Sequence, residues 1–126
     1  MIKIQKLSPI LVVNEIEPCI EFWQQIGFEK TIEILEGAKL GFLALEKDGV
    51  EIMYQSLKSI KKDLPAVEKE GLSKSFFYIK INGIDAIQKK FSLKSIVVPL
   101  RKTFYGALEV FVREPGGNII GFSEKI

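Results

Sequence analysis

One order of predicted elements, a strand, a helix and three further strands, occurs twice in this chain, and the repetition limits its fold more than any other feature. The first copy spans about residues 4–56 and the second about residues 75–126. A polar, lysine-rich linker with one or two helical turns is expected between them, over residues 57–74. The apolar runs that predict strands cover residues 7–13, 28–34, 40–45 and 50–55, and then 75–81, 95–98, 103–112 and 119–123.

Each predicted helix is marked by apolar residues that recur at helical spacing and so share one face. These residues are Cys19, Phe22, Trp23 and Ile26 in the first copy, and Ile84, Ile87 and Phe91 in the second. Asn14, with Glu17 three residues later, is the expected N-cap pair of the first helix. Because one helix covers only one face of a sheet, we expect an α+β fold in which two βαβββ modules lie side by side and form a curled mixed sheet around a cleft. Small ligands bind in clefts of this kind.

The chain contains no histidine and only one cysteine, Cys19. Zinc, iron and nickel sites usually draw on imidazole nitrogen or thiolate sulfur. Ser–His and Cys–His nucleophilic pairs both need a histidine. These absences predict that the protein works without such a metal and without imidazole. A lone cysteine forms no internal disulfide, which favours a cytoplasmic location.

The length of 126 residues predicts a single domain. The net charge of +2 is too small to indicate a nucleic acid or an anionic membrane as a partner. No apolar stretch approaches the roughly 20 residues of a membrane span, and the first residues lack the pattern of a signal peptide. We therefore expect no nucleic-acid partner and no association with membranes.

Three segments of the sequence, in this order and at this spacing, resemble the vicinal oxygen chelate superfamily of glyoxalases, bleomycin resistance proteins and extradiol dioxygenases. They are Leu11–Glu17 followed by Phe22-Trp23 and Ile26-Gly27-Phe28, then Lys80–Ala86, then Phe111–Ile120. They are similar to the family's "D-hydrophobic-E … F-Y … L-G-F", "V-D-D-I-D-A" and "R-D-P-D-G-N" patterns. The match extends over almost the whole chain.

The resemblance places the family's metal-ligand positions at Ser8, Met53, Phe76 and Gly121. None of these four residues reproduces the family's histidine and glutamate ligands. The resemblance therefore implies a protein with no metal and no cofactor, like the bleomycin-resistance-type members that sequester a small molecule.

Strand alternation from these positions predicts which side chains face a ligand. The candidates are Ser8, Met53, Tyr54, Phe76, Tyr78, Glu109, Phe111 and Arg113. Tyr54 is included because the register of its strand is open by one residue, so it replaces its neighbour Met53 if the strand is shifted.

Each candidate also has a purely structural interpretation. Phe76 and Tyr78 form either an aromatic wall for a flat ligand or part of the core. Glu109 and Arg113 are a buried acid and an anion-binding fork, or a cross-strand ion pair. The connection before the penultimate strand, with Arg101, Lys102 and Tyr105, either contacts an acidic ligand or is a solvated loop.

The leading hypothesis is a homodimeric, metal-free protein of the resistance type that binds a small, aromatic molecule and is not an enzyme. A second hypothesis is a metal-independent lyase or isomerase. It would use Glu109, with a raised pKa, as the base, and Tyr78 or Arg113 to stabilise an oxyanion. A third is a dimerisation or partner module without a ligand, which side chains of Phe76, Met53 and Phe111 filling the cleft would favour.

Overall fold

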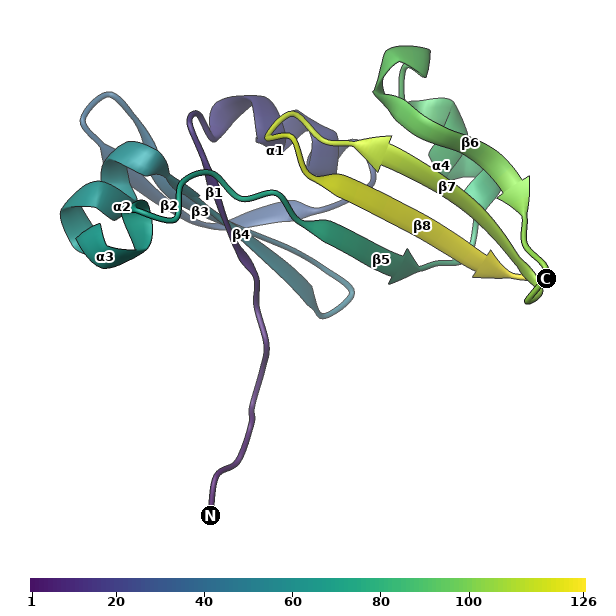
Figure 1. Cartoon of the computed structure of the whole chain (residues 1–126), viewed down its shortest axis with the longest axis horizontal. Coiled ribbons are helices and arrows are strands. Elements are labelled where there is room, and N and C mark those ends of the chain that lie inside the picture. Colours follow the sequence, from purple (N-terminus) through teal and green to yellow (C-terminus); the bar gives the residue numbers. More distant parts are fainter. The chain divides into compact units, whose positions relative to one another are not determined.

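The computed structural model describes residues 1–126, and the chain divides into two compact units, Met1–Ser73 and Lys74–Ile126 (Figure 1). Each unit has the element order strand, helix and three further strands around one four-stranded mixed sheet. The predicted α+β class and the two βαβββ modules are therefore confirmed.

Unit one contains one sheet, in the strand order β1-β4-β3-β2, and three helices. Its elements are β1 (Ile10–Val13), α1 (Glu17–Gln24), β2 (Glu29–Glu36), β3 (Lys39–Lys47), β4 (Val50–Ser56), α2 (Leu57–Asp63) and α3 (Pro65–Glu68). β1 pairs with β4 in parallel, and the remaining pairs are antiparallel. The β3–β4 hairpin turns at Asp48-Gly49, where both residues have positive φ, as the Asp-Gly pair predicts.

Helix α1 packs its apolar stripe on the sheet of unit one. Cys19, Phe22 and Trp23 are buried, and the Trp23 indole N–H donates to the Tyr54 hydroxyl at 2.8 Å. The expected Asn14–Glu17 capping pair is wrong, because the N-cap is Ile16, two residues after Asn14, and it makes no side-chain capping hydrogen bond. The Glu17 carboxylate instead accepts from the backbone N–H of Leu40, at 2.7 Å.

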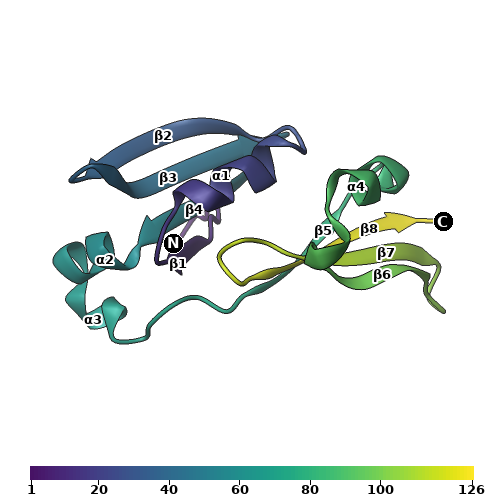
Figure 2. The ribbon, with the colours of Figure 1, turned by 90° about the horizontal axis from the view of Figure 1, so that it is seen from above.

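Unit two repeats this arrangement with the strand order β5-β8-β7-β6. Its elements are β5 (Phe76–Lys80), α4 (Ile84–Lys90), a 3₁₀ turn (Leu93–Ser95), β6 (Ile96–Lys102), β7 (Ala107–Arg113) and β8 (Ile119–Lys125). Helix α4 lies on one side of the sheet (Figure 2), where Phe91 stacks on Phe122 with ring centroids 5.9 Å apart. The Glu124 carboxylate of β8 accepts from the N–H groups of Gly83 and Ile84, so a strand side chain caps this helix.

The two units are related by the same pairing of their parallel strands. Ile10 lies opposite Met53 in β1 and β4, and Tyr78 lies opposite Gly121 in β5 and β8. The separation in sequence from Ile10 to Tyr78 equals that from Met53 to Gly121. The sequence repeat predicts this same offset between the two copies. Ser8, which precedes β1, and Phe76, at the start of β5, hold equivalent places in this scheme.

None of the helices combines the length and the apolar character needed to cross a lipid bilayer.

Candidate functional site

The candidate site lies on the face of the second sheet opposite α4, here called the open face. The strand register arranges its side chains in rows that run across the four strands. A polar row consists of Lys80, Ser123, Glu109 and Arg101. The next row consists of Tyr78, Gly121, Phe111 and Val98. Phe76, Ile119 and Arg113 begin the third.

Glu109 lies in the middle of the polar row and is 0% exposed to solvent. One carboxylate oxygen accepts from Arg101 Nη2 at 2.8 Å and from Arg101 Nε at 3.2 Å. The other accepts from the hydroxyls of Tyr78 and Tyr105. The Tyr78 hydroxyl is also hydrogen-bonded to the Ser123 hydroxyl, with the oxygens 2.7 Å apart. Four hydrogen bonds fill the acceptor sites of a carboxylate, so Glu109 has none left for a ligand.

These partners fix the charge of the cluster. Burial by itself raises the pKa of Glu109, but the hydrogen bonds from Tyr105, Tyr78 and Arg101 together outweigh it and hold that pKa below its usual value. The same carboxylate raises the pKa of Arg101 and raises the pKa of Tyr105 to about 12. At neutral pH the cluster is therefore an ionised carboxylate surrounded by a guanidinium and a neutral phenol.

Aromatic side chains cover the middle of the open face. Phe111 meets Phe76 edge to face, with ring centroids 5.6 Å apart. The guanidinium carbon of Arg101 lies over the Phe111 ring, 5.8 Å from its centroid. Phe111 is almost fully buried, whereas Phe76 is 70% exposed. An aromatic ring is thus presented to a ligand while its neighbour supports it.

Gly121 leaves the space that Phe111 occupies. A Cβ built on Gly121 would come within 2.6 Å of Phe111 Cε2, closer than real Cβ atoms approach other atoms. The resemblance places the family's closing glutamate at this glycine, and the phenyl ring of Phe111 lies over the position. A carboxylate ligand has no room there unless the ring moves.

The first unit holds the other candidates. The Ser8 hydroxyl donates to Glu51 at 2.5 Å, and Lys6 Nζ lies 3.1 Å from the same carboxylate. These contacts, the Ser8 hydrogen bond first, lower the pKa of Glu51. Met53 is partly exposed and lies on the face opposite α1.

The alternative register that would bring Tyr54 to that face is wrong. Tyr54 is 0% exposed beneath α1, where its hydroxyl accepts from Trp23. The physical reason is the strand period of two: Met53 and Tyr54 point to opposite faces, and the indole N–H needs a buried partner.

Three predictions about the charged residues of unit two need correction. Arg101 and Lys102 belong to β6 and not to a loop, and Arg101 is the ion-pair partner of Glu109. The residue expected to form that pair or an anion fork, Arg113, lies two rows away and donates to the carbonyl of Gly117 at 3.2 Å. The base hypothesis expected a raised pKa for Glu109, and the pKa is lowered.

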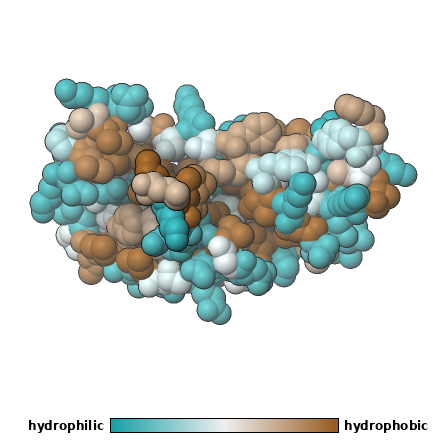
Figure 3. Space-filling model, turned by 90° about the horizontal axis from the view of Figure 1, so that it is seen from below, coloured by the Kyte–Doolittle hydropathy of each residue, from teal (hydrophilic) through white to brown (hydrophobic).

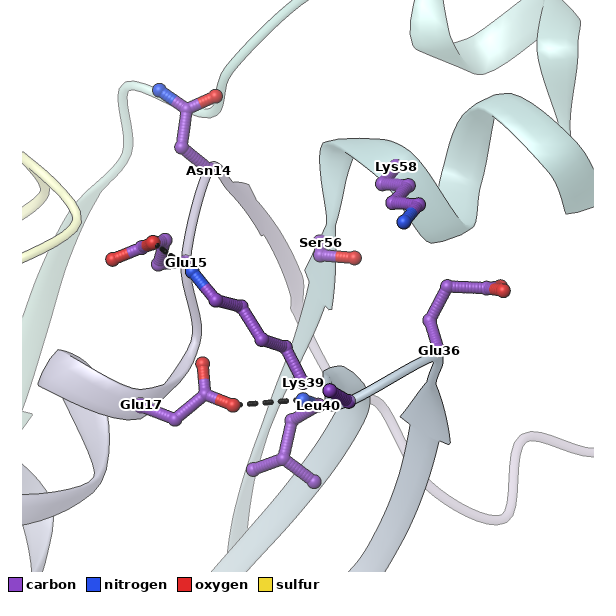
Figure 4. Close-up of a pocket in the computed structure, with 9 residues that line it drawn as sticks. Asn14, Glu15, Glu17, Glu36, Lys39, Leu40, Ser56 and Lys58 are labelled. Atoms are coloured by element: carbon purple, nitrogen blue, oxygen red, sulfur yellow. Dashed lines mark hydrogen bonds and ion pairs between the residues drawn. The ribbon is translucent and has the colours of Figure 1, made fainter.

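A pocket of about 260 Å³ lies in unit one, where the turn before α1, the β2–β3 hairpin and the start of α2 meet (Figure 4). Lys39 reaches across it to Glu15, at 2.5 Å, and Glu17 accepts from the backbone of Leu40. These groups satisfy one another, and the volume is below the roughly 300 Å³ at which ligand pockets begin. We assign the pocket a structural role.

No group of three or more histidine, cysteine, aspartate or glutamate side chains is arranged to hold a metal ion. At the four positions that the resemblance gives for metal ligands, the residues fit no such group either. Ser8 is engaged with Glu51, and Gly121 has a phenyl ring over it.

No protein-family model and no curated protein matches this chain. Solved structures do match it. A glyoxalase/bleomycin resistance protein/dioxygenase from Nocardioides superposes with a TM-score of 0.72 at 16% identity, over 100% of this chain and 86% of that one. A lactoylglutathione lyase from Agrobacterium tumefaciens gives 0.71 at 16% identity, over 95% and 92%. The bleomycin-binding protein from bleomycin-producing Streptomyces verticillus, complexed with copper(II)-bleomycin, gives 0.60 at 18% identity, over 100% of both chains.

Proposed function

We propose that this chain, which has the glyoxalase/bleomycin resistance/dioxygenase fold, binds a small organic molecule without a metal ion and without transforming it. The open face of the second sheet is the proposed site. The observation that carries the proposal is the state of Glu109, whose carboxylate is buried and fully occupied by Arg101, Tyr78 and Tyr105. Such a group holds its neighbours in place and has no free lone pair with which to take a proton.

The same observation weighs against the lyase or isomerase alternative. A general base works best with a pKa near the operating pH, and the pKa of Glu109 lies below even its ordinary value. The phenol of Tyr105, with a pKa of about 12, is protonated at neutral pH. Binding requires only shape, aromatic surface and fixed polar groups, all of which this face offers.

Names of the matching structures give a precedent for both kinds of role. One is a bleomycin-binding protein complexed with copper(II)-bleomycin and another is a lactoylglutathione lyase. Identities of 16–18% show a shared fold and leave the ligand open. A resistance role by sequestration is our proposal for the cellular use of the binding, in the cytoplasm.

We further propose that two copies associate. The segment before β1 extends away from its sheet and exposes apolar side chains, among them Ile2, Ile4 and Leu7 (Figure 1). Edge strand β2 is also exposed along its length and carries Ile34 and Leu35. Hydrophobic patches lie among hydrophilic side chains on the side toward which the N-terminal segment extends (Figure 3). Exposed apolar surface of this kind is typical of an interface, and sedimentation velocity at micromolar concentration should give a dimer, whereas a monomer would contradict it.

The binding function is tested by a thermal-shift screen of aromatic compounds, neutral and charged, in EDTA and again with divalent metal ions. A ligand at a hundredfold its dissociation constant adds about 2.7 kcal/mol to the free energy of unfolding. We expect at least one compound to raise the midpoint equally in EDTA and with metal. Stabilisation that requires a metal ion would refute the proposal.

The matched control separates the proposed site from the rest of the surface. Phe76→Ala should remove the stabilisation by the compound, since this ring is the most exposed aromatic of the open face, with little change in the unliganded protein. Phe104→Ala changes a ring of the β6–β7 connection that is fully exposed, and should leave the stabilisation unchanged. Loss of the stabilisation in Phe104→Ala but not in Phe76→Ala would show that the compound binds outside the open face.

A further inference from the structure

We infer that the ligand of the open face carries an anionic group and is bound in one orientation, with the anion over the polar row and an aromatic ring over Phe76 and Phe111. The inference rests on the proposed function and names the chemical class of its ligand. Three features of the second unit carry it: the exposed end of the Arg101 guanidinium, the charge balance of the face and the spacing of its rows.

Arg101 has a hydrogen-bonding edge that Glu109 does not occupy. A guanidinium offers five N–H donors in a planar fork. Glu109 takes one side edge of that fork, through Nε and Nη2. The end edge, formed by one Nη1 hydrogen and the second Nη2 hydrogen, points away from Glu109, and the side chain is 52% exposed although Tyr105 also interacts with it. That end edge matches two oxygens of a carboxylate, sulfonate or phosphate.

Glu109 and the aromatic ring of Phe111 hold Arg101 for this purpose. The buried carboxylate fixes the side edge of the guanidinium, and Phe111 lies 5.8 Å from its carbon. Ordering a long arginine side chain otherwise costs side-chain conformational entropy. Here that ordering precedes ligand binding, which favours affinity.

The charge balance of the open face also favours an anion. One carboxylate, that of Glu109, lies among the strand residues of this face. Four basic residues share the face with it: Lys80, Arg101, Arg113 and Lys125. Glu109 neutralises Arg101, whereas Lys80 at the end of the polar row and Lys125 in the neighbouring row remain exposed. A cationic ligand would be repelled by this set of charges.

The rows set the orientation. Lys80 and Tyr78 are two residues apart in β5, as are Glu109 and Phe111 in β7, so the polar and aromatic rows are about 7 Å apart. A compound with two fused aromatic rings and an anionic group on one of them spans this separation. The anion then meets Arg101, with Lys80 at the far end of the same row, while the ring packs beside Phe111, whose ring lies 5.6 Å from that of Phe76.

The test compares two probes that differ in charge and share one ring system. Calorimetric titration of the full chain in EDTA is made with 2-naphthoate and with neutral 2-naphthamide. We expect 2-naphthoate to bind at least tenfold more tightly at low salt, and the difference to shrink as salt is raised. Equal affinities would overturn the anionic class and leave the proposed function standing. Absence of binding by 2-naphthoate at millimolar concentration would also overturn it, while the screen with neutral aromatics decides the proposed function separately.

Variants assign the effect to the polar row. Arg101→Lys keeps the charge and the pairing with Glu109 and loses the end edge, so naphthoate affinity should fall while naphthamide affinity stays. Lys80→Gln, which leaves the Glu109 cluster intact, should weaken naphthoate alone and to a smaller extent. Lys94→Gln, in the 3₁₀ turn, is the matched control and should change neither. Equal losses for both probes, or a loss in Lys94→Gln as large as that in Lys80→Gln, would overturn the assignment.

Discussion

Phe111 and Gly121 lie opposite each other in β7 and β8, and the ring of Phe111 fills the place where a side chain at position 121 would stand. Gly121→Ala should therefore lower the free energy of unfolding by about 1–3 kcal/mol through overpacking. The same substitution in a Phe111→Ala background should cost much less. Urea denaturation of the four proteins of this cycle gives the coupling, and additive effects would contradict the contact.

The ionised state of Glu109 predicts a loss of stability in acid. The folded pKa lies below the ordinary value of 4.5, so as the pH falls below about 4.5 the unfolded chain binds a proton first and the folded state loses this contribution. Glu109→Gln should be less stable than wild type at pH 7, and the difference should narrow between about pH 4.5 and the lower folded pKa.

Urea midpoints from pH 7 to pH 3 measure this. Glu51→Gln is the control for a more exposed acid whose pKa is also lowered. If the difference in stability between Glu109→Gln and wild type stayed constant from pH 7 to pH 3, the hydrogen bonds to Glu109 would not lower its pKa.

Tyr105 should ionise late. Its hydrogen bond to Glu109 raises its pKa from 10.0 to about 12, so the stability that it contributes is complete below pH 10 and is lost as the pH rises toward 12. Absorbance at the phenolate band should show a step near pH 12 that Tyr105→Phe removes. In Glu109→Gln the step should move toward pH 10. A Tyr105 that titrates near pH 10 in the wild type would refute the contact.

The Trp23–Tyr54 hydrogen bond predicts an effect on the core of the first unit. Tyr54→Phe leaves the buried indole N–H without its acceptor and should cost about 1–3 kcal/mol. Trp23 is the only tryptophan in the chain, so its fluorescence follows the unfolding of that unit. Tyr54→Phe should also change the emission of Trp23 in the folded protein, whereas Tyr105→Phe should leave that emission unchanged, and equal changes in both variants would contradict the contact.

The element order of the fold could be predicted because each strand and helix carries its own periodicity. Cys19, Phe22 and Trp23 mark one helix face, and the apolar runs mark the strands. Strand alternation also grouped Tyr78, Glu109 and Phe111 among the candidates, and the strand register places these three side chains on one face. Helix periodicity and strand alternation depend on residues that are close together in the sequence, so a single sequence is enough to reveal them.

The partner of Glu109 could not be predicted, because it depends on a register across irregular pairing. Val98 lies opposite Phe111 and Arg101 opposite Glu109, so β6 contains one more residue than β7 between these pairs. An extra residue of this kind moves every later side chain to the other face. Tyr105 reaches the same carboxylate from the β6–β7 connection, whose conformation no periodicity describes. The only signal for Arg101 in the sequence was its residue type, an arginine that follows the apolar run of β6.

The measurement that tests the central claim most directly is an amide chemical-shift map of the protein titrated with 2-naphthoate in EDTA. We predict that the largest shifts fall in β5, β6 and β7 around Phe76, Arg101 and Phe111, and that α4 and the pocket near Lys39 stay unchanged. Shifts confined to α4 or to that pocket, or shifts that appear only after a divalent metal ion is added, would contradict a metal-free binding site on the open face.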